Sequence, residues 1–81
     1  MTRVTVNHPI FRSVGYDAED QMMEVSFRDG RLMLYRSVPM AVYDNFMRAS
    51  HRVDVSMEDY YRSVIEGHFP AREIRPARAP A

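Results

Sequence analysis

The residues from 22 to 35 constrain the fold of this chain more than any other segment. Residues 22–28 alternate apolar and polar side chains, which is the pattern of a strand with one buried face. Asp29-Gly30 follows, and this pair is a strong signal for a two-residue type I′ turn, since both of its central positions need a positive φ. A second apolar strand, residues 31–35, comes after the turn. A β-hairpin is therefore predicted at the centre of the fold.

A two-residue turn would also determine which side chains share a face of the hairpin. It pairs Ser26 with Met33 and Glu24 with Tyr35, and a shift of one residue would exchange the two faces of a strand. We therefore expect Met33 and Tyr35 to lie together on the outer face. The side chains expected on the core face are Val25, Phe27, Leu32 and Leu34.

The segments before the hairpin indicate one more strand and an ambiguous N-terminus. Residues 10–16 are predicted as a strand, and residues 17–20 supply turn chemistry before the hairpin begins. Residues 2–7 also alternate, but His8-Pro9 interrupts them, because proline cannot donate a ladder hydrogen bond. Residues 1–9 are therefore interpreted as either a flexible arm or an edge strand.

Two helices are predicted after the hairpin. Pro39 suits a first helical position, and the helix that it starts should end near Ser50. Ser56 precedes an acidic first turn and is expected to cap a second helix that stops at Gly67. Residues 71–81 form an Arg/Pro/Ala-rich tail, which we expect to be mostly mobile. The compact domain is placed at residues 10–74, and the flexible tail proper at residues 75–81.

The fold class expected from these elements is α+β. It consists of an antiparallel meander of three strands, or four if the N-terminal segment joins, followed by two helices packed on one face. The helix residues expected to cover the core side of the sheet are Val42, Phe46, Tyr61, Val64 and Ile65. They are expected to pack against Val14, Val25, Phe27, Leu32 and Leu34.

Length and composition exclude several classes of protein. The chain has 81 residues, enough for one small core. It has no cysteine, so disulfides and cysteine zinc sites are excluded. Eleven basic residues, all arginine, balance eleven acidic ones, which argues against a strong nonspecific binder of polyanions. The N-terminal residues do not form an apolar leader, and no stretch approaches the length of a membrane span. We therefore expect a cytoplasmic protein without membrane association.

No group of residues has the spacing of a catalytic or metal site. His8, His51 and His68 are far apart in predicted connections, without a metal-ligand motif. The serines lack a glycine-flanked nucleophile elbow, and the three glycines are too scattered for a phosphate-binding loop. The sequence therefore predicts a protein that is not an enzyme and has no metal, small-molecule cofactor or catalytic residues.

The outer face of the hairpin is the predicted interaction surface. An exposed Tyr35 could stack on an RNA base, with arginines on the phosphates. It could equally be covered by a partner protein or a second copy of the chain, and we favour cover over RNA. The residues assigned to this face are Arg28, Arg31, Met33, Tyr35, Arg36 and Arg62.

Several short motifs, in a characteristic order, resemble the KTSC domain. These are residues 12–17 (RSVGYD), 24–27 (EVSF), Gly30, Tyr35, 38–39 (VP), 42–43 (VY), 49–50 (AS), Ile65 and 69–70 (FP). The KTSC domain is named for a C-terminal appendage of some lysyl-tRNA synthetases, and it also occurs alone in small bacterial and phage proteins. The resemblance covers about residues 10–74.

The resemblance implies a domain of unknown molecular function, for which RNA binding has been suggested from its attachment to a synthetase. Two positions depart from the family pattern. The family's central Tyr-x-Tyr is Met33-Leu34-Tyr35 here, and its aromatic-Asn pair is Tyr61-Arg62. We therefore expect an interaction module that acts through protein contact or self-association, with weak RNA binding by the Met33/Tyr35 face as the alternative.

Overall fold

The predicted hairpin lies at the centre of a five-stranded antiparallel sheet. The structure, a computed structural model, describes residues 2–51 and 56–74. Neighbouring strands in the chain are neighbours in the sheet, which is therefore a simple meander. The strands are β1 (Thr2–Thr5), β2 (Phe11–Asp17), β3 (Met22–Phe27), β4 (Leu32–Tyr35) and β5 (Ala71–Ile74).

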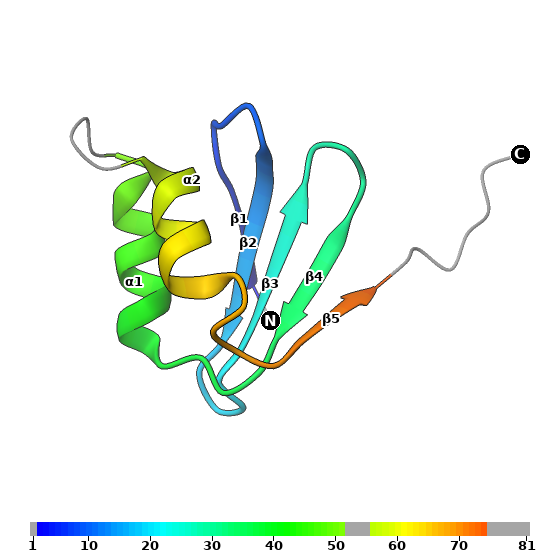
Figure 1. Cartoon of the computed structure of the whole chain (residues 1–81), viewed down its shortest axis with the longest axis vertical. Coiled ribbons are helices and arrows are strands. Elements are labelled where there is room, and N and C mark those ends of the chain that lie inside the picture. Colours follow the sequence, from blue (N-terminus) through cyan, green and yellow to red (C-terminus); the bar gives the residue numbers. More distant parts are fainter. Residues whose placement is uncertain (1, 52–55, 75–81) are drawn as a thin grey trace, which may run out of the picture.

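Both helices pack on one face of the sheet and leave the other face open (Figure 1). The α+β class and the two helices agree with the sequence prediction, but the expected number of three or four strands is wrong. The N-terminal segment is an edge strand, because β1 pairs with β2 from Thr2↔Tyr16 to Thr5↔Ser13. The fifth strand comes from the segment expected to be a tail.

Strand β5 forms because the chain returns to the free edge of β4 after the second helix. Arg36 donates its backbone N–H to the Pro70 carbonyl at 2.9 Å, and Ala71 then lies opposite Tyr35. Apart from Ile74, the residues of β5 have little β propensity, so pairing with the neighbouring strand decides the conformation of β5. The predicted flexible tail at residues 75–81 lies outside the described residues.

The turn of the central hairpin is one residue longer than predicted. Phe27 and Arg31 close it, with the Phe27 N–H donating to the Arg31 carbonyl at 2.8 Å. Of Asp29 and Gly30, only Gly30 has a positive φ, at +99°. The Asp29 carboxylate instead accepts the Arg31 N–H at 3.0 Å. This is a three-residue loop with glycine in the left-handed position, and aspartate side chains stabilise such loops by bonding two residues ahead.

The longer turn shifts the register of β4 by one residue and exchanges its two faces. Tyr35 lies opposite Met23, and Leu34 lies opposite Glu24. Tyr35 and Met33 therefore point toward the helices, whereas Leu34 and its counterpart Leu32 lie on the open face. The predicted outer placement of Met33 and Tyr35, and the predicted core placement of the two leucines, are both wrong.

A bulge in β2 brings a further aromatic ring into the core. The pairing with β3 shifts between Phe11 and Ser13, so Arg12 is the extra residue. Phe11 is consequently fully buried together with Val14. A bulge accommodates one extra residue and re-aims the side chains on either side of it.

The helices start where the sequence predicts, but the second helix changes from α-helix to π-helix along its length. Helix α1 (Met40–Ala49) follows Pro39. Helix α2 (Met57–Tyr60) is capped by Ser56, whose hydroxyl accepts the Asp59 N–H at 3.3 Å. It continues as one turn of π-helix, η1 (Tyr61–Ile65). Gly67 follows at φ +79°, which agrees with the predicted stop.

The core lies between the helices and the inner face of the sheet. Predicted core members that are buried are Val14, Val25, Phe27, Phe46, Tyr61 and Ile65, while Val42 and Val64 pack partly buried against them. Residues that the sequence prediction did not place there are Val6, Phe11, Tyr35, Val38 and Met57. Within residues 2–51 and 56–74, no helix is both long and apolar enough to cross a membrane.

Candidate functional site

The six residues predicted to form one interaction face lie in four different places. Met33 and Tyr35 are on the inner face of the sheet. Tyr35 is only 1% exposed, and its hydroxyl is hydrogen-bonded to that of Tyr61. A ring buried in this way is not available to stack on a base, so the structure does not support the predicted stacking role of Tyr35.

Arg28 donates hydrogen bonds to the connection between β1 and β2. Its Nε donates to the His8 carbonyl at 2.6 Å and its Nη2 donates to the Val6 carbonyl at 3.1 Å. The backbone N–H of Arg28 donates to the Ile10 carbonyl at 2.9 Å. These bonds tie the hairpin turn to the strand connection, so we assign Arg28 a structural role.

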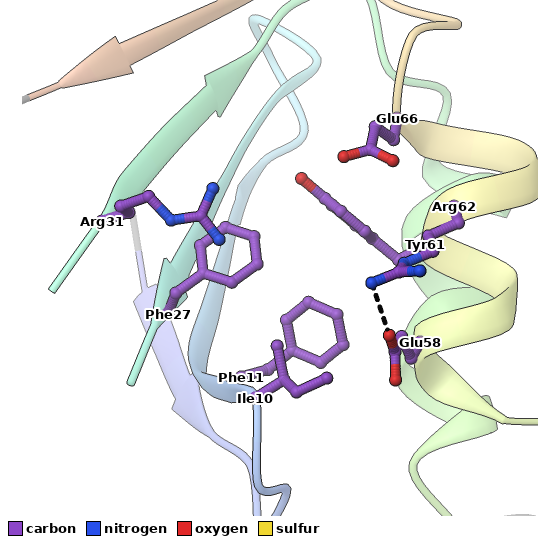
Figure 2. A pocket seen from close by; sticks show the side chains of 8 residues that line it. All are labelled: Ile10, Phe11, Phe27, Arg31, Glu58, Tyr61, Arg62 and Glu66. Atoms are coloured by element: carbon purple, nitrogen blue, oxygen red, sulfur yellow. Dashed lines mark ion pairs between the residues drawn. The ribbon is translucent and has the colours of Figure 1, made fainter. Parts of the chain in front are cut away.

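Arg31 and Arg62 approach the same cleft from opposite sides (Figure 2). The cleft encloses about 70 Å³ between the hairpin turn and the second helix. Arg31 stands on the sheet side, and Arg62 on the helix side. The full set of lining residues is Ile10, Phe11, Phe27, Arg31, Glu58, Tyr61, Arg62 and Glu66.

On the sheet side, the hairpin turn holds the Arg31 guanidinium in place. Its Nε is 2.9 Å from Oδ2 of Asp29, and its central carbon lies 4.4 Å from the centre of the Phe27 ring, within the range of a cation–π contact. The Arg31 backbone N–H and guanidinium lower the pKa of Asp29. Hydrogen bonding to Asp29 raises the pKa of Arg31, so both groups stay charged at neutral pH.

On the helix side, the π-helical turn positions Tyr61 and Glu66. The Glu66 N–H donates to the Tyr61 carbonyl, five residues back, at 2.7 Å. Nη2 of Arg62 pairs with Oε2 of Glu58 at 2.7 Å, one helical turn apart. Short π-helical turns are often found at functional sites. Sequence analysis missed the roles of Glu58, Tyr61 and Glu66, because no residue pattern distinguished a π turn from an ordinary helix end.

The paired hydroxyls of Tyr35 and Tyr61 stay protonated at neutral pH. Burial raises the pKa of Tyr35 and that of Tyr61, and the nearby Glu66 carboxylate raises both further. A phenol with a raised pKa is a hydrogen-bond donor and not a base or a nucleophile at pH 7. The cleft is therefore suited to binding a polar group through hydrogen bonds.

Arg36 lies on the other side of the sheet, away from the two described helices. It lines a shallow depression of about 230 Å³ with Met22, Leu34 and Arg72. Strand pairing places Leu32 and Ile74 in the adjacent row of the same face. We call these six residues, which lie on β3, β4 and β5 and, for Arg36, directly after β4, the open-face patch. The half of the open face toward β1 is more polar, with Arg3 and Glu24 2.9 Å apart.

Potential metal ligands are spread out over the part of the chain that the structure describes. There, no three histidine or acidic side chains come together in an arrangement that could hold a metal ion.

Comparison with known proteins places this chain in a family. Residues 10–69 match the family model of the KTSC domain. An uncharacterized protein of Stutzerimonas stutzeri (strain A1501) is 36% identical over an alignment of 66 residues, and the match covers 76% of this chain and 93% of that protein. The crystal structure of a KTSC domain protein from Yersinia pestis superposes with a TM-score of 0.80 at 34% identity, covering 90% of this chain and 96% of that one. The residues that suggested the resemblance thus belong to a shared fold, and this chain is a member of the KTSC domain family.

Proposed function

We propose that this KTSC domain is a non-catalytic interaction module that binds a partner protein through the open-face patch. The observation that carries the proposal is that neither of the described helices covers this face of the sheet (Figure 1). Four apolar side chains of the patch, Met22, Leu32, Leu34 and Ile74, are partly exposed there. Contiguous apolar surface bordered by polar residues is typical of protein interaction sites.

The charges of the patch indicate the chemistry of the partner. Arg36 and Arg72 are both exposed, and the depression that they line contains no acidic residue among those described. Arginine is enriched in protein interfaces and pairs well with carboxylates. A surface that combines apolar and acidic side chains would therefore match both components of the patch.

The charges of the edge strand β5 disfavour two of the registers in which a second copy could pair with it. Two copies paired antiparallel through β5, with their faces aligned, must be centred on a residue that lies opposite itself. Of the four residues of β5, Arg72 and Glu73 as centres place like charges directly opposite each other, which is destabilising, whereas Ala71 and Ile74 as centres do not. The net charge of zero removes long-range repulsion, but this local repulsion acts against self-association in those two registers.

The alternative of RNA binding has less support on this face. The described residues of the open-face patch include no aromatic ring, and the sequence argument for RNA relied on Tyr35. Without stacking, arginine–phosphate contacts alone would give weak binding that falls steeply with salt. RNA is therefore kept as an outcome of the test.

Site-specific photocrosslinking in cells tests the proposal. A photoreactive phenylalanine analogue replaces Leu34, and the matched control carries it at Asp44, an exposed position of α1. We expect protein adducts only from position 34, and we expect them to disappear when Arg36→Glu and Arg72→Glu are added. Equal labelling from position 44, or adducts unaffected by the charge reversals, would contradict the proposal.

The same experiment separates the alternatives. Adducts that nuclease treatment removes would support RNA binding, and adducts of twice the chain's mass would support self-association. Light scattering coupled to gel filtration, with and without bulk RNA, gives an independent measurement of mass.

A further inference from the structure

The cleft in Figure 2 presents hydrogen-bond donors and acceptors to the same small space. Arg62 and Glu58 form an ion pair, with 2.7 Å between Nη2 and Oε2. Arg31 contacts Asp29 through its Nε, and its two terminal amino groups can each donate further hydrogen bonds. The Glu66 carboxylate reaches over the hydroxyl end of Tyr61 from the helix side. The two arginines and two glutamates of the lining cancel in formal charge.

The buried tyrosine pair carries one proton more than its own hydrogen bond uses. Each hydroxyl has one proton and can also accept. When one hydroxyl of the Tyr35–Tyr61 pair donates to the other, the proton of the second hydroxyl is left to donate elsewhere. Tyr61 is 6% exposed and lines the cleft. The raised pKa of both tyrosines keeps these protons in place.

The dimensions of the cleft restrict what can enter it. A volume of about 70 Å³ holds a few water molecules, which is room for one small planar group but not for a nucleobase or a sugar. The floor consists of aromatic rings, since Phe11, Phe27 and Tyr61 all line the cleft. A flat group can lie against such a floor with its polar atoms directed to the rim.

We propose that this cleft binds a carboxamide group, such as the side chain of a glutamine or asparagine of a partner protein. The amide oxygen accepts from Arg31 and from the spare tyrosine proton, and the amide nitrogen donates to Glu66. A neutral group that both donates and accepts hydrogen bonds suits a lining of zero net charge. A carboxylate in the cleft would face the two glutamates, and a cation would face the two arginines. The site lies on the helix side of the sheet and does not depend on the open-face patch.

Three probes of the same shape test the proposal. Acetamide, acetate and acetamidinium differ mainly in charge, which is zero, −1 and +1. The full chain, labelled with ¹⁵N, is titrated with each probe at pH 7 and constant ionic strength, and the backbone amide shifts are followed. We expect acetamide to give saturable shifts at Arg31, Arg62 and Glu66, with a millimolar or weaker Kd for so few atoms. No saturable shift at these residues, or tighter binding of acetate or acetamidinium, would overturn the proposal.

Conservative variants identify the groups responsible. Tyr61→Phe removes the hydroxyl that lines the cleft but keeps the ring, and it is expected to weaken acetamide binding about fivefold, as the loss of one hydrogen bond does. Tyr60→Phe is the matched control, because the Tyr60 hydroxyl donates to the Val42 carbonyl at 3.4 Å and does not line the cleft. It should bind as the parent does.

A surface variant covers the case in which Tyr61→Phe unfolds. Glu66 is exposed, so Glu66→Ala leaves the core intact and should weaken acetamide binding by a similar factor. Parent-like affinity in Glu66→Ala, or in a folded Tyr61→Phe variant, would show that the carboxamide is not held as proposed.

Discussion

The two faces of the sheet differ in which kinds of residue they carry. The face under the helices is rich in aromatic rings. For example, the centre of the Phe11 ring lies within 5.5 Å of the ring centres of Phe27, Phe46 and Tyr61. The open face carries aliphatic side chains together with arginines and small polar residues. Rings bury more area and pack more specifically than aliphatic chains. The covered face therefore stabilises the fold, while the open face is free to be selected for contacts.

Adjacent residues of β4 make this comparison testable, because they point to opposite faces. Leu34 is partly exposed on the open face, while Tyr35 is buried. The sequence interpretation had these two positions reversed.

Truncation of Tyr35 should have the largest effect on stability. Tyr35→Ala removes a buried ring and leaves a cavity, so we expect a loss of about 3–5 kcal/mol in the free energy of unfolding. Leu34→Ala, on the open face, should cost about 1 kcal/mol or less. Urea denaturation followed by circular dichroism measures both. Equal losses, or a larger loss for Leu34→Ala, would mean that the register of β4 is the one first predicted from the turn.

Substitution of Gly30 tests the turn that sets this register. Gly30→Ala places a side chain at φ +99°, where nothing lies within 4 Å of the new Cβ, so the cost comes from the backbone alone. We expect a loss of about 1–2 kcal/mol. Gly30→Asn should lose less, because asparagine tolerates positive φ better. Thermal melts give the ranking, and an alanine variant as stable as the parent would contradict the three-residue loop.

Two arginines that were assigned to one face should differ in their contribution to stability. Arg28→Gln removes two bonds to backbone carbonyls and should destabilise the domain by about 1–2 kcal/mol. Arg36→Gln, on the open face, should change stability by less than about 0.5 kcal/mol. Matched denaturation curves compare them. Equal effects would remove the distinction between a structural and a surface arginine.

Alkaline pH should weaken the covered face and leave the open face unaffected. The pKa values of Tyr35 and Tyr61 are raised above 10.0 in the folded state. Above pH 10 the unfolded chain therefore holds fewer protons than the folded one, and stability falls as the pH rises. Below pH 10 this contribution is fully present. Unfolding followed at pH 8 to 12 should show the decline, with a smaller slope in Tyr35→Phe or Tyr61→Phe. An unchanged slope in both variants would contradict the assignment.

Local patterns in the sequence were sufficient for most of the elements and for the family. Period-two alternation identified β2 and β3, Pro39 and Ser56 identified the starts of the helices, and Gly67 identified a stop. Each of these signals acts within a few residues, where backbone sterics and capping hydrogen bonds dominate. The candidate site was predicted less well, since only Arg31 and Arg62 of the six chosen residues line the cleft.

Longer-range contacts decided the remaining features. The side chain of Asp29 selected a three-residue loop, and that single extra residue exchanged the faces of β4. Strand β5 formed because β4 offered a free edge, and no pattern within its own four residues required it. The Tyr35–Tyr61 pair joins residues 26 positions apart, so no local signal could reveal it. The sequence alone determined the alternation of the strands, because alternation depends only on neighbouring residues. Strand register, strand pairing and the polar cleft were decided by the tertiary structure, because they depend on hydrogen bonds and apolar contacts between residues that are distant in the sequence.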